Sequence, residues 1–238
     1  MIFLPSGFRR KGASAIAVHD GHRARKKLQF RTHGLEAFAD HEVLEMLLFY
    51  AIPRQDTNPI AHRLIDRFGS LDAVLSAPAE ELEKVDGVGE HAATLLSLLL
   101  PVVRRAFLSA GAQDIILDTT ERLGRYFCML FLGAREEAFY EVCLDAKGKL
   151  LRCCKLADGS VDAVSLNVRR VVENALRCHA SAVALAHNHP SGVALPSEDD
   201  NTSTLLAHDA LRTVGIALVD HIIVADNDFV SLRENGLF

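Results

Sequence analysis

The sequence predicts an α+β protein in which an all-α N-terminal part precedes a domain of the α/β class. Up to about residue 110, apolar residues recur at the three-to-four-residue spacing of amphipathic helices. After Gly111–Asp114, the best candidate for a linker, short apolar runs typical of strands alternate with helical patterns, which indicates a layered sheet. We therefore expect a poorly ordered tail over residues 1–19, a helical domain over 20–112 and an α/β domain over 116–238.

Residues that start or stop helices divide the first part. Asp40 is expected to cap a helix over 41–51, which Pro53 ends. Asp56-Thr57 leads into a helix that ends at Gly69. The other helices are expected from Asp20 onward, over 71–76, over 78–85 and, bent at Pro101, from Glu90 to about Ala110.

The second part begins with a helix expected over 119–132. Two strands, over 137–144 and 150–156, are joined by a turn at 145–148. The amphipathic pattern of 167–179 predicts a helix with Val168, Val171, Val172, Ala175 and Leu176 inward, and the small apolar residues of 181–186 predict a strand buried on both faces. The remaining elements are a helix over 197–214 and strands over 216–219, 222–225 and 229–232.

Composition indicates a soluble protein of the cytoplasm with no membrane partner. With 49% hydrophobic and 24% charged residues the chain is ordinary for a globular protein, and no apolar run approaches the roughly 18 residues of a membrane span. Its five cysteines include no C-x-x-C pair, which favours a reducing compartment. Because Trp is absent and Tyr is scarce, there is little aromatic surface for stacking single-stranded nucleic acid.

The net charge of -5 conceals a basic N-terminal segment. Residues 1–33 contain eight Lys and Arg residues against the single acid Asp20, so this segment carries +7 and the remainder -12. Two interpretations are open. The segment is either a solvated basic tail or an arm that contacts phosphate or an acidic partner.

Gly87-Val88-Gly89 lies between two helical patterns. Two glycines around a small apolar residue allow a sharp turn with exposed N–H groups at a helix N-terminus, which is a natural seat for phosphate. The turn resembles the helix-hairpin-helix motif of non-sequence-specific DNA-binding proteins. A basic residue often follows the second glycine in that motif, whereas Glu90 and His91 stand here, so a tight turn that packs the helices is an equally good interpretation.

The densest chemical signal is the stretch from His187 to Asp200. The apolar run before it ends in His187-Asn-His189, and the two-residue period of a strand points both imidazoles to the same side. Two imidazoles and a carboxylate form a common catalytic zinc set. The carboxylate could come from Asp199 or Asp200, and Ser197-x-x-Asp200 also has the pattern of a helix cap.

His187-x-His189-Pro190 followed by Ser197-x-x-Asp200 resembles the JAMM/MPN metalloprotease motif. Nearly the whole chain after the tail is similar to the bacterial RadC family. The similarity is carried by Gly21-His-Arg, Leu48-Phe-Tyr-Ala-Ile-Pro-Arg, Asp56-Thr, Phe68-Gly-Ser, Gly87-Val-Gly, the block from His187 to Asp200 and Asp220-His-Ile-Ile-Val. This resemblance implies an all-α helix-hairpin-helix domain followed by an MPN domain of cytidine-deaminase-like α/β/α architecture.

The resemblance also implies a set of roles. It implies zinc (Zn²⁺) held by His187, His189 and Asp200, with Glu137 as the carrier of the proton of an activated water. Glu136 and Glu141 are the alternatives to Glu137, and Ser197 is expected to donate to the developing oxyanion. Asn188 departs from the eukaryotic isopeptidases, in which Ser or Thr often stands between the histidines.

Three functional classes remain after the deaminases are excluded, because a deaminase needs H-x-E and P-C-x-x-C and position 189 is His. The first is a zinc-dependent peptidase or isopeptidase with a protein or peptide substrate. The second is DNA association through the N-terminal domain, with Gly87, Val88 and Gly89 as contacts. The third, a metal-dependent nuclease, is disfavoured because one mononuclear ligand set is visible. His221 and the Cys153-Cys154 pair are expected to be structural, and neither the natural substrate nor the oligomeric state follows from the sequence.

Overall fold

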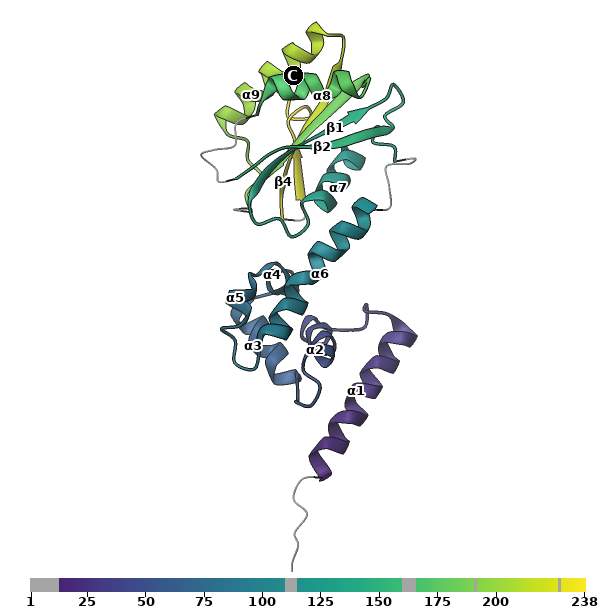
Figure 1. Cartoon of the computed structure of the whole chain (residues 1–238), viewed down its shortest axis with the longest axis vertical. Helices are drawn as coiled ribbons and strands as arrows, with labels where there is room; N and C mark the ends of the chain where they lie inside the picture. The colour runs from purple at the N-terminus through teal and green to yellow at the C-terminus, as the bar shows by residue number, and fades with distance from the viewer. Residues whose placement is uncertain (1–12, 110–114, 160–165, 191, 227) are drawn as a thin grey trace, which may run out of the picture. The chain divides into compact units, whose positions relative to one another are not determined.

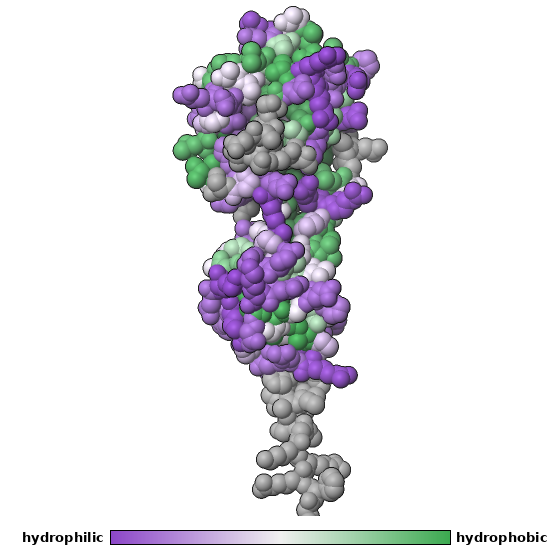
Figure 2. Space-filling model, turned by 60° about the vertical axis from the view of Figure 1, so that its left-hand side comes forward, coloured by the Kyte–Doolittle hydropathy of each residue, from purple (hydrophilic) through white to green (hydrophobic). Residues whose placement is uncertain are grey.

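The computed structural model describes residues 13–109, 115–159, 166–190, 192–226 and 228–238. Residues 1–12 of the predicted tail and the predicted linker Gly111–Asp114 lie outside this part of the chain. The chain divides into two compact units, Met1–Leu99 and Leu100–Phe238 (Figure 1). On the face shown in Figure 2, hydrophilic side chains cover most of the surface, with smaller apolar areas between them.

The first unit is helical. Its helices are α1 (Ala13–His33), α2 (Asp40–Ala51), α3 (Asn58–Phe68), α4 (Leu71–Ser76), α5 (Ala79–Leu82) and the first half of α6 (Glu90–Ser109). Leu44 and Leu48 of α2, Ile60 and Leu64 of α3 and Leu96 of α6 are fully buried in one cluster. The apolar residues at three-to-four-residue spacing in α2 and α3 therefore form the face that each helix turns to the core.

Two helix starts differ from the prediction. Helix α1 begins at Ala13 instead of Asp20. Helix α2 is capped from Ala39, whose N–H donates to Oε2 of Glu42 at 3.0 Å. The predicted cap, Asp40, instead accepts the Leu71 N–H at 3.2 Å and ties α2 to the start of α4. Asp40 thus accepts from a residue distant in the sequence instead of capping its own helix.

Arg23 attaches α1 to the C-terminal end of α2. Its guanidinium donates to the carbonyl oxygens of Phe49, Ile52, Pro53 and Gln55 at 2.6–3.2 Å, and it lies 4.9 Å from the centre of the Phe49 ring. The last carbonyls of a helix lack intrahelical donors, so a cation is well placed there. Arg23 therefore satisfies the end of α2 while it holds α1 in place.

The glycine turn before α6 packs tightly. Gly87 has a φ of +90°, and a Cβ there would lie 2.9 Å from the Ile60 side chain, so both conformation and space require glycine. Val88 is 5% exposed and belongs to the core of the first unit. These contacts explain Gly87 and Val88 by packing, and a DNA contact at the turn stays a prediction.

Within the described residues, α6 alone is long and apolar enough by length and composition to cross a membrane, with a hydropathy of 1.5. The sequence prediction concerns uninterrupted apolar runs. The apolar stretch of α6 is interrupted by Pro101 and two arginines. Ala92, Ala93 and Leu96 lie in the core of the first unit, and Phe107 packs on the core of the second. Only 17% of the apolar window of α6 is buried, and Leu98 and Val102 are exposed. A single helix of this kind is weak evidence for a span.

The second unit contains one mixed sheet, in which five strands of the described chain follow the order β2-β1-β3-β4-β5. The strands are β1 (Glu137–Leu144), β2 (Leu150–Gly159), β3 (Ala182–Asn188), β4 (Ala217–Ala225) and β5 (Asp228–Ser231). Only the β3–β4 pair is parallel. Strand β3, which carries the histidine motif, therefore lies in the centre of the sheet.

Helices cover both faces of this sheet (Figure 1). On one face, α7 (Thr120–Phe131) buries Phe127 and Leu130 against Tyr140 and Val142. On the other face, α8 (Val168–Arg177) and α9 (Glu198–Thr213) pack Val171 and Leu211 near Phe139. The second unit is thus a three-layer α/β/α domain, as the sequence predicts.

Two predictions for this unit are wrong. The strands expected over 216–219 and 222–225 form the single strand β4, because the polar residues between them have internal partners. Asp220 accepts hydrogen bonds from the Ser231 hydroxyl at 2.8 and 2.9 Å, which allows it to be buried in a strand. Leu176, expected to face inward from α8, is 50% exposed.

Candidate metal centre

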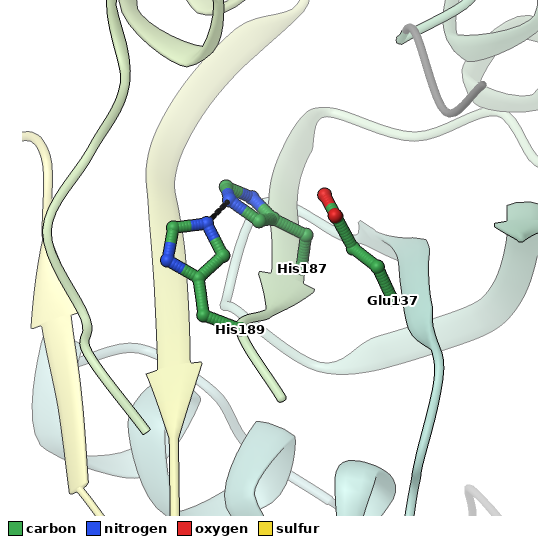
Figure 3. A group of neighbouring side chains, drawn as sticks. All are labelled: Glu137, His187 and His189. Carbon is green, nitrogen blue, oxygen red and sulfur yellow. Dashed lines mark hydrogen bonds between the residues drawn. The ribbon is translucent and has the colours of Figure 1, made fainter. Parts of the chain in front are cut away.

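The two histidines of the motif lie at the end of β3 and converge (Figure 3). His187 pairs with Phe139 of β1, and the His189 N–H donates to Val224 O at 2.8 Å, which continues the pairing with β4 past the end of β3. The Nε2 atoms of the two rings lie 2.9 Å apart. His187 is completely buried and its ring stacks on Phe139 with 4.5 Å between centroids. The strand period and this stacking together fix where His187 points.

The hydrogen bond of His189 sets its tautomer. Its Nδ1 lies 2.8 Å from the carbonyl oxygen of Val193. A carbonyl oxygen only accepts, so Nδ1 carries the proton and donates. The Nε2 atom of His189 therefore presents its lone pair toward His187, as a metal ligand requires.

A chain of hydrogen bonds sets the tautomer of His187 in the same way. The Thr204 hydroxyl donates to Asp200 O at 2.5 Å, so its oxygen must accept from Nδ1 of His221, also at 2.5 Å. The Nε2 atom of neutral His221 is then an acceptor, and it lies 2.9 Å from Nδ1 of His187. In this tautomer His187 donates from Nδ1 and has a lone pair on Nε2, so the contact between the two Nε2 atoms in Figure 3 requires a proton or a metal cation between them.

His221 remains neutral for a physical reason. Burial, followed by repulsion from His187, lowers the pKa of His221 well below its ordinary value. A doubly protonated His221 would donate to His187 and force the proton of that ring onto Nε2. Burial of His221 therefore protects the ligand form of His187.

Asp200 faces both imidazoles from the first turn of α9. Its Oδ1 lies 3.3 Å from Nε2 of His187, and its Oδ2 lies 3.9 Å from Nε2 of His189. The backbone N–H and the hydroxyl of Ser197 donate to Oδ2 at 2.8 and 2.6 Å, while Ser197 Oγ accepts the Asp200 N–H at 3.0 Å. This capping box occupies Oδ2 and directs Oδ1 to the site.

Asp200 is held in its ionised form. Burial opposes ionisation, but the hydrogen bond and charge that His187 supplies when Nε2 carries a proton, together with the donors of Ser197, outweigh it and hold the pKa of Asp200 well below its ordinary value. The competing candidate, Asp199, is exposed on the outer side of the same turn. Ser197 itself uses its hydroxyl proton in the cap, so its predicted oxyanion role requires an exchange of partner.

Glu137 approaches the pair from β1 (Figure 3). A carboxylate oxygen of Glu137 and one nitrogen from each histidine lie within 4.8 Å of one another. Burial raises the pKa of Glu137, while the histidines act in the opposite direction. Within the described part of the chain its carboxylate has no hydrogen-bond partner, so it is free to exchange a proton.

The alternatives to Glu137 are placed differently. Glu141 lies four residues farther along β1, fully buried, where Oε2 accepts from Nδ2 of Asn174 at 2.9 Å. Glu136 contributes its carbonyl oxygen to Asn188 at 3.1 Å. Of the three acids, Glu137 is the one whose carboxylate groups with the histidine pair.

Asn188, considered in the sequence only as a departure from related motifs, holds the backbone around Glu137. Its Oδ1 accepts the Ala138 N–H at 2.9 Å, and its Nδ2 donates to Glu136 O. The two bonds grip the chain immediately before and after Glu137. The sequence contains a signal for this role, since Asn188 is a polar residue in an otherwise apolar central strand.

These residues fit a metal ion. The Nε2 atoms of His187 and His189 lie 2.9 Å apart, and Oδ1 of Asp200 lies 3.3 Å from Nε2 of His187. The group whose ligand atoms all lie within 4.8 Å of one another consists of the two histidines and Glu137. Two imidazoles with either carboxylate form a donor set suited to a metal ion. The ring hydrogen bonds to Val193 O and His221 are the outer contacts that orient such ligands. Two carboxylates, those of Asp200 and Glu137, therefore lie next to the histidine pair.

Comparison with known proteins agrees with this architecture. A family model described as the RadC-like JAB domain matches residues 117–237. A UPF0758 protein of Ruegeria pomeroyi is 38% identical over 216 residues, which cover 90% of this chain and 96% of the relative. A UPF0758 protein of Rhodobacter capsulatus is 38% identical (88% and 98% covered), and one of Fusobacterium nucleatum is 33% identical (92% and 97%). The names of these relatives state no activity.

Proposed function

The chain belongs to the RadC family of proteins with a JAB domain, and on this premise we propose that it is a zinc-dependent hydrolase of amide or isopeptide bonds. The observation that carries the proposal is the convergence of two Nε2 lone pairs and the Asp200 carboxylate beside Glu137. JAMM-type hydrolysis needs this combination of three ligands and one proton carrier.

Zinc bound by His187, His189 and Asp200 would act as a Lewis acid that acidifies water and polarises a carbonyl group. Glu137 would accept the proton of the attacking water at its carboxylate and deliver it to the leaving amine. The raised pKa of Glu137 suits both tasks, because a carboxylate of ordinary pKa holds a proton too weakly to return it near neutral pH.

The carboxylates of Asp200 and Glu137 have different proposed roles. The pKa of Asp200 is lowered and that of Glu137 is raised, so one acid stays ionised as a ligand while the other exchanges a proton. Pairs of acids whose environments push their pKa values apart are typical of hydrolytic sites. We assign the oxyanion contact to Ser197, after its hydroxyl turns from Asp200 to the substrate.

The substrate proposed is a protein or peptide. We place the reaction in the cytoplasm, because all five cysteines are free thiols. Association with DNA is a separate property, and neither the helix-hairpin-helix nor the basic arm is needed for the chemistry described.

The experiment is metal analysis of the purified chain followed by cleavage of a peptide library. Wild type should retain about one zinc per chain and release peptide fragments, with activity lost to a chelator and restored by zinc. Glu137→Gln should keep the zinc and lose at least about a hundredfold in rate. Glu136→Gln, which changes the neighbouring acid, is the matched control and should remain active.

Two results would overturn the proposal. One is a wild-type chain that binds no zinc in a competition titration. The other is a Glu137→Gln variant that keeps both zinc and full activity. Cleavage of a DNA duplex without cleavage of any peptide would replace amide hydrolysis by phosphodiester hydrolysis.

A further inference from the structure

A cavity of about 680 Å³ lies away from the candidate metal centre, between the edge strand β2 and helix α8. Its lining comprises Arg152, Cys153, Cys154, Lys155, Asn167, Arg169, Arg170, Glu173, Asn174 and Arg177. Five of these ten residues are cationic and one is acidic, whereas the whole chain carries -5. The cavity is therefore a concentrated positive region on a protein that is negative overall.

Little of this positive charge is neutralised locally. Glu173, the one acid among the described lining residues, accepts from Nε of Arg169 at 2.8 Å, and the charge of Arg177 also acts on it. Arg170 donates to the carbonyl oxygen of Leu156 at 2.5 Å, which fixes its guanidinium, and its charge acts on the buried carboxyl group of Glu141. Within the part of the chain that the structure describes, Arg152 and Arg177 make no hydrogen bond or ion pair. Two guanidinium groups, one from each wall, are thus free for an anionic ligand.

The rest of the lining also favours an anion. Helix α8 starts at the cavity, with Asn167 as its N-cap, and the N-terminus of a helix carries partial positive charge. Asn174 is held by the buried Glu141, so its amide has a fixed place in the wall. Four of the five cations are arginine, whose planar fork donates two parallel hydrogen bonds to a phosphate.

The lining excludes several kinds of ligand. Among the described residues the lining contains no aliphatic or aromatic side chain, so this part of the wall lacks the apolar anchors on which peptide and protein partners depend. For the same reason it offers no surface on which unpaired bases could stack. Charge and hydrogen bonding remain, and these are the contacts that proteins make to the sugar-phosphate backbone.

We propose that this cavity binds the phosphodiester backbone of duplex nucleic acid, without reading its sequence. The site is on the second unit, and it is separate from the glycine turn and from the basic N-terminal segment. Glu141, which lies behind the wall, is four residues from Glu137 along β1, a separation of about 13 Å. The proposal does not depend on hydrolysis at the metal centre.

The test is binding of the full-length chain to a fluorescein-labelled DNA duplex, measured by anisotropy over a range of salt concentrations. The variant is Arg152→Gln/Arg177→Gln. The control is Arg122→Gln/Arg125→Gln, which makes the same change in charge on exposed arginines of α7, over the opposite face of the sheet. A random-sequence duplex and a duplex RNA of equal length complete the set.

We expect the cavity variant to bind at least tenfold more weakly than wild type. Loss of two phosphate contacts should also reduce the slope of log K against log salt by about 1.8. The control should change neither quantity, and DNA sequence should have no effect. RNA bound as tightly as DNA would extend the site to both duplexes.

Three outcomes would overturn the proposal. Equal losses in both double variants would show a general effect of net charge. Unchanged binding of the cavity variant would move the DNA contact elsewhere, for example to the basic N-terminal segment. Poly-glutamate that competes with the duplex at equal charge would make the partner an acidic peptide instead.

Discussion

Thr204 decides whether His187 can bind a metal, although it would not touch the metal itself. Thr204→Val keeps the shape of the side chain and removes the hydroxyl that accepts from Nδ1 of His221. His221 then has two options. Either its Nδ1–H remains a buried donor without a partner, or its proton moves to Nε2 and faces His187. In the second case the proton of His187 must move to its ligand atom Nε2. An unpaired buried donor costs about 1–3 kcal/mol, so zinc affinity should fall roughly 10- to 100-fold.

Competition with a chromophoric chelator measures this loss directly. Thr204→Ser is the matched control, because it retains the hydroxyl and should bind zinc within about threefold of wild type. Thermal unfolding of the metal-free proteins separates this effect from stability, since the hydroxyl also bonds to Asp200 O within α9. The reasoning fails if Thr204→Val binds zinc as tightly as wild type, or if Thr204→Ser loses as much affinity as Thr204→Val.

Three further predictions concern the second unit. Asn188→Ala removes both hydrogen bonds that hold the chain around Glu137, so kcat should fall at least about tenfold while zinc affinity changes less than twofold. Burial raises the pKa of Glu141 from an ordinary 4.5 to about 7, so ionisation destabilises the fold as the pH rises through this interval. Hydrogen exchange of β1 should therefore show Glu141→Gln to be up to about 3 kcal/mol more stable at pH 8, with no gain at pH 4. Gly124→Ala places a methyl group about 2.3 Å from the Phe229 ring. Overpacking should cost about 1–3 kcal/mol, which exceeds the stabilisation of about 1 kcal/mol from replacing glycine by alanine in a helix. The melting temperature of Gly124→Ala should therefore fall, and the additional change Phe229→Leu should restore it.

Elements with local signals were predicted closely. Strand β1 and helix α4 have the predicted bounds, because the signals that delimit them, the turn at 145–148 and the cap of Ser70, are adjacent to the segments themselves. Strand β4 was divided in two because Asp220 and His221 resemble a break, and their partners Ser231 and Thr204 lie elsewhere in the chain. The cap of α2 failed for the same reason, since the partner of Asp40 is 31 residues away.

The candidate site shows the same division between local and distant information. His187 and His189 lie two residues apart at the end of a predicted strand, so spacing alone predicts that they act together. The choice of Asp200 over Asp199 and the oxyanion role of Ser197 required the family resemblance. Glu137 required the family resemblance, because 50 residues and one strand pairing separate it from His187. The hydrogen bond between Thr204 and His221 connects helix α9 to strand β4, and no local sequence pattern predicts it.

The ligand set joins two elements that differ in how easily they loosen. The histidines belong to the central strand of the sheet or continue its ladder, whereas Asp200 belongs to the first turn of α9 and is held there by Ser197. Helix ends fray before a central strand opens, because they hold fewer cooperative hydrogen bonds. On mild heating a metal bound at the proposed site should therefore be released, and the proposed activity lost, before the second unit unfolds, and cooling should restore both.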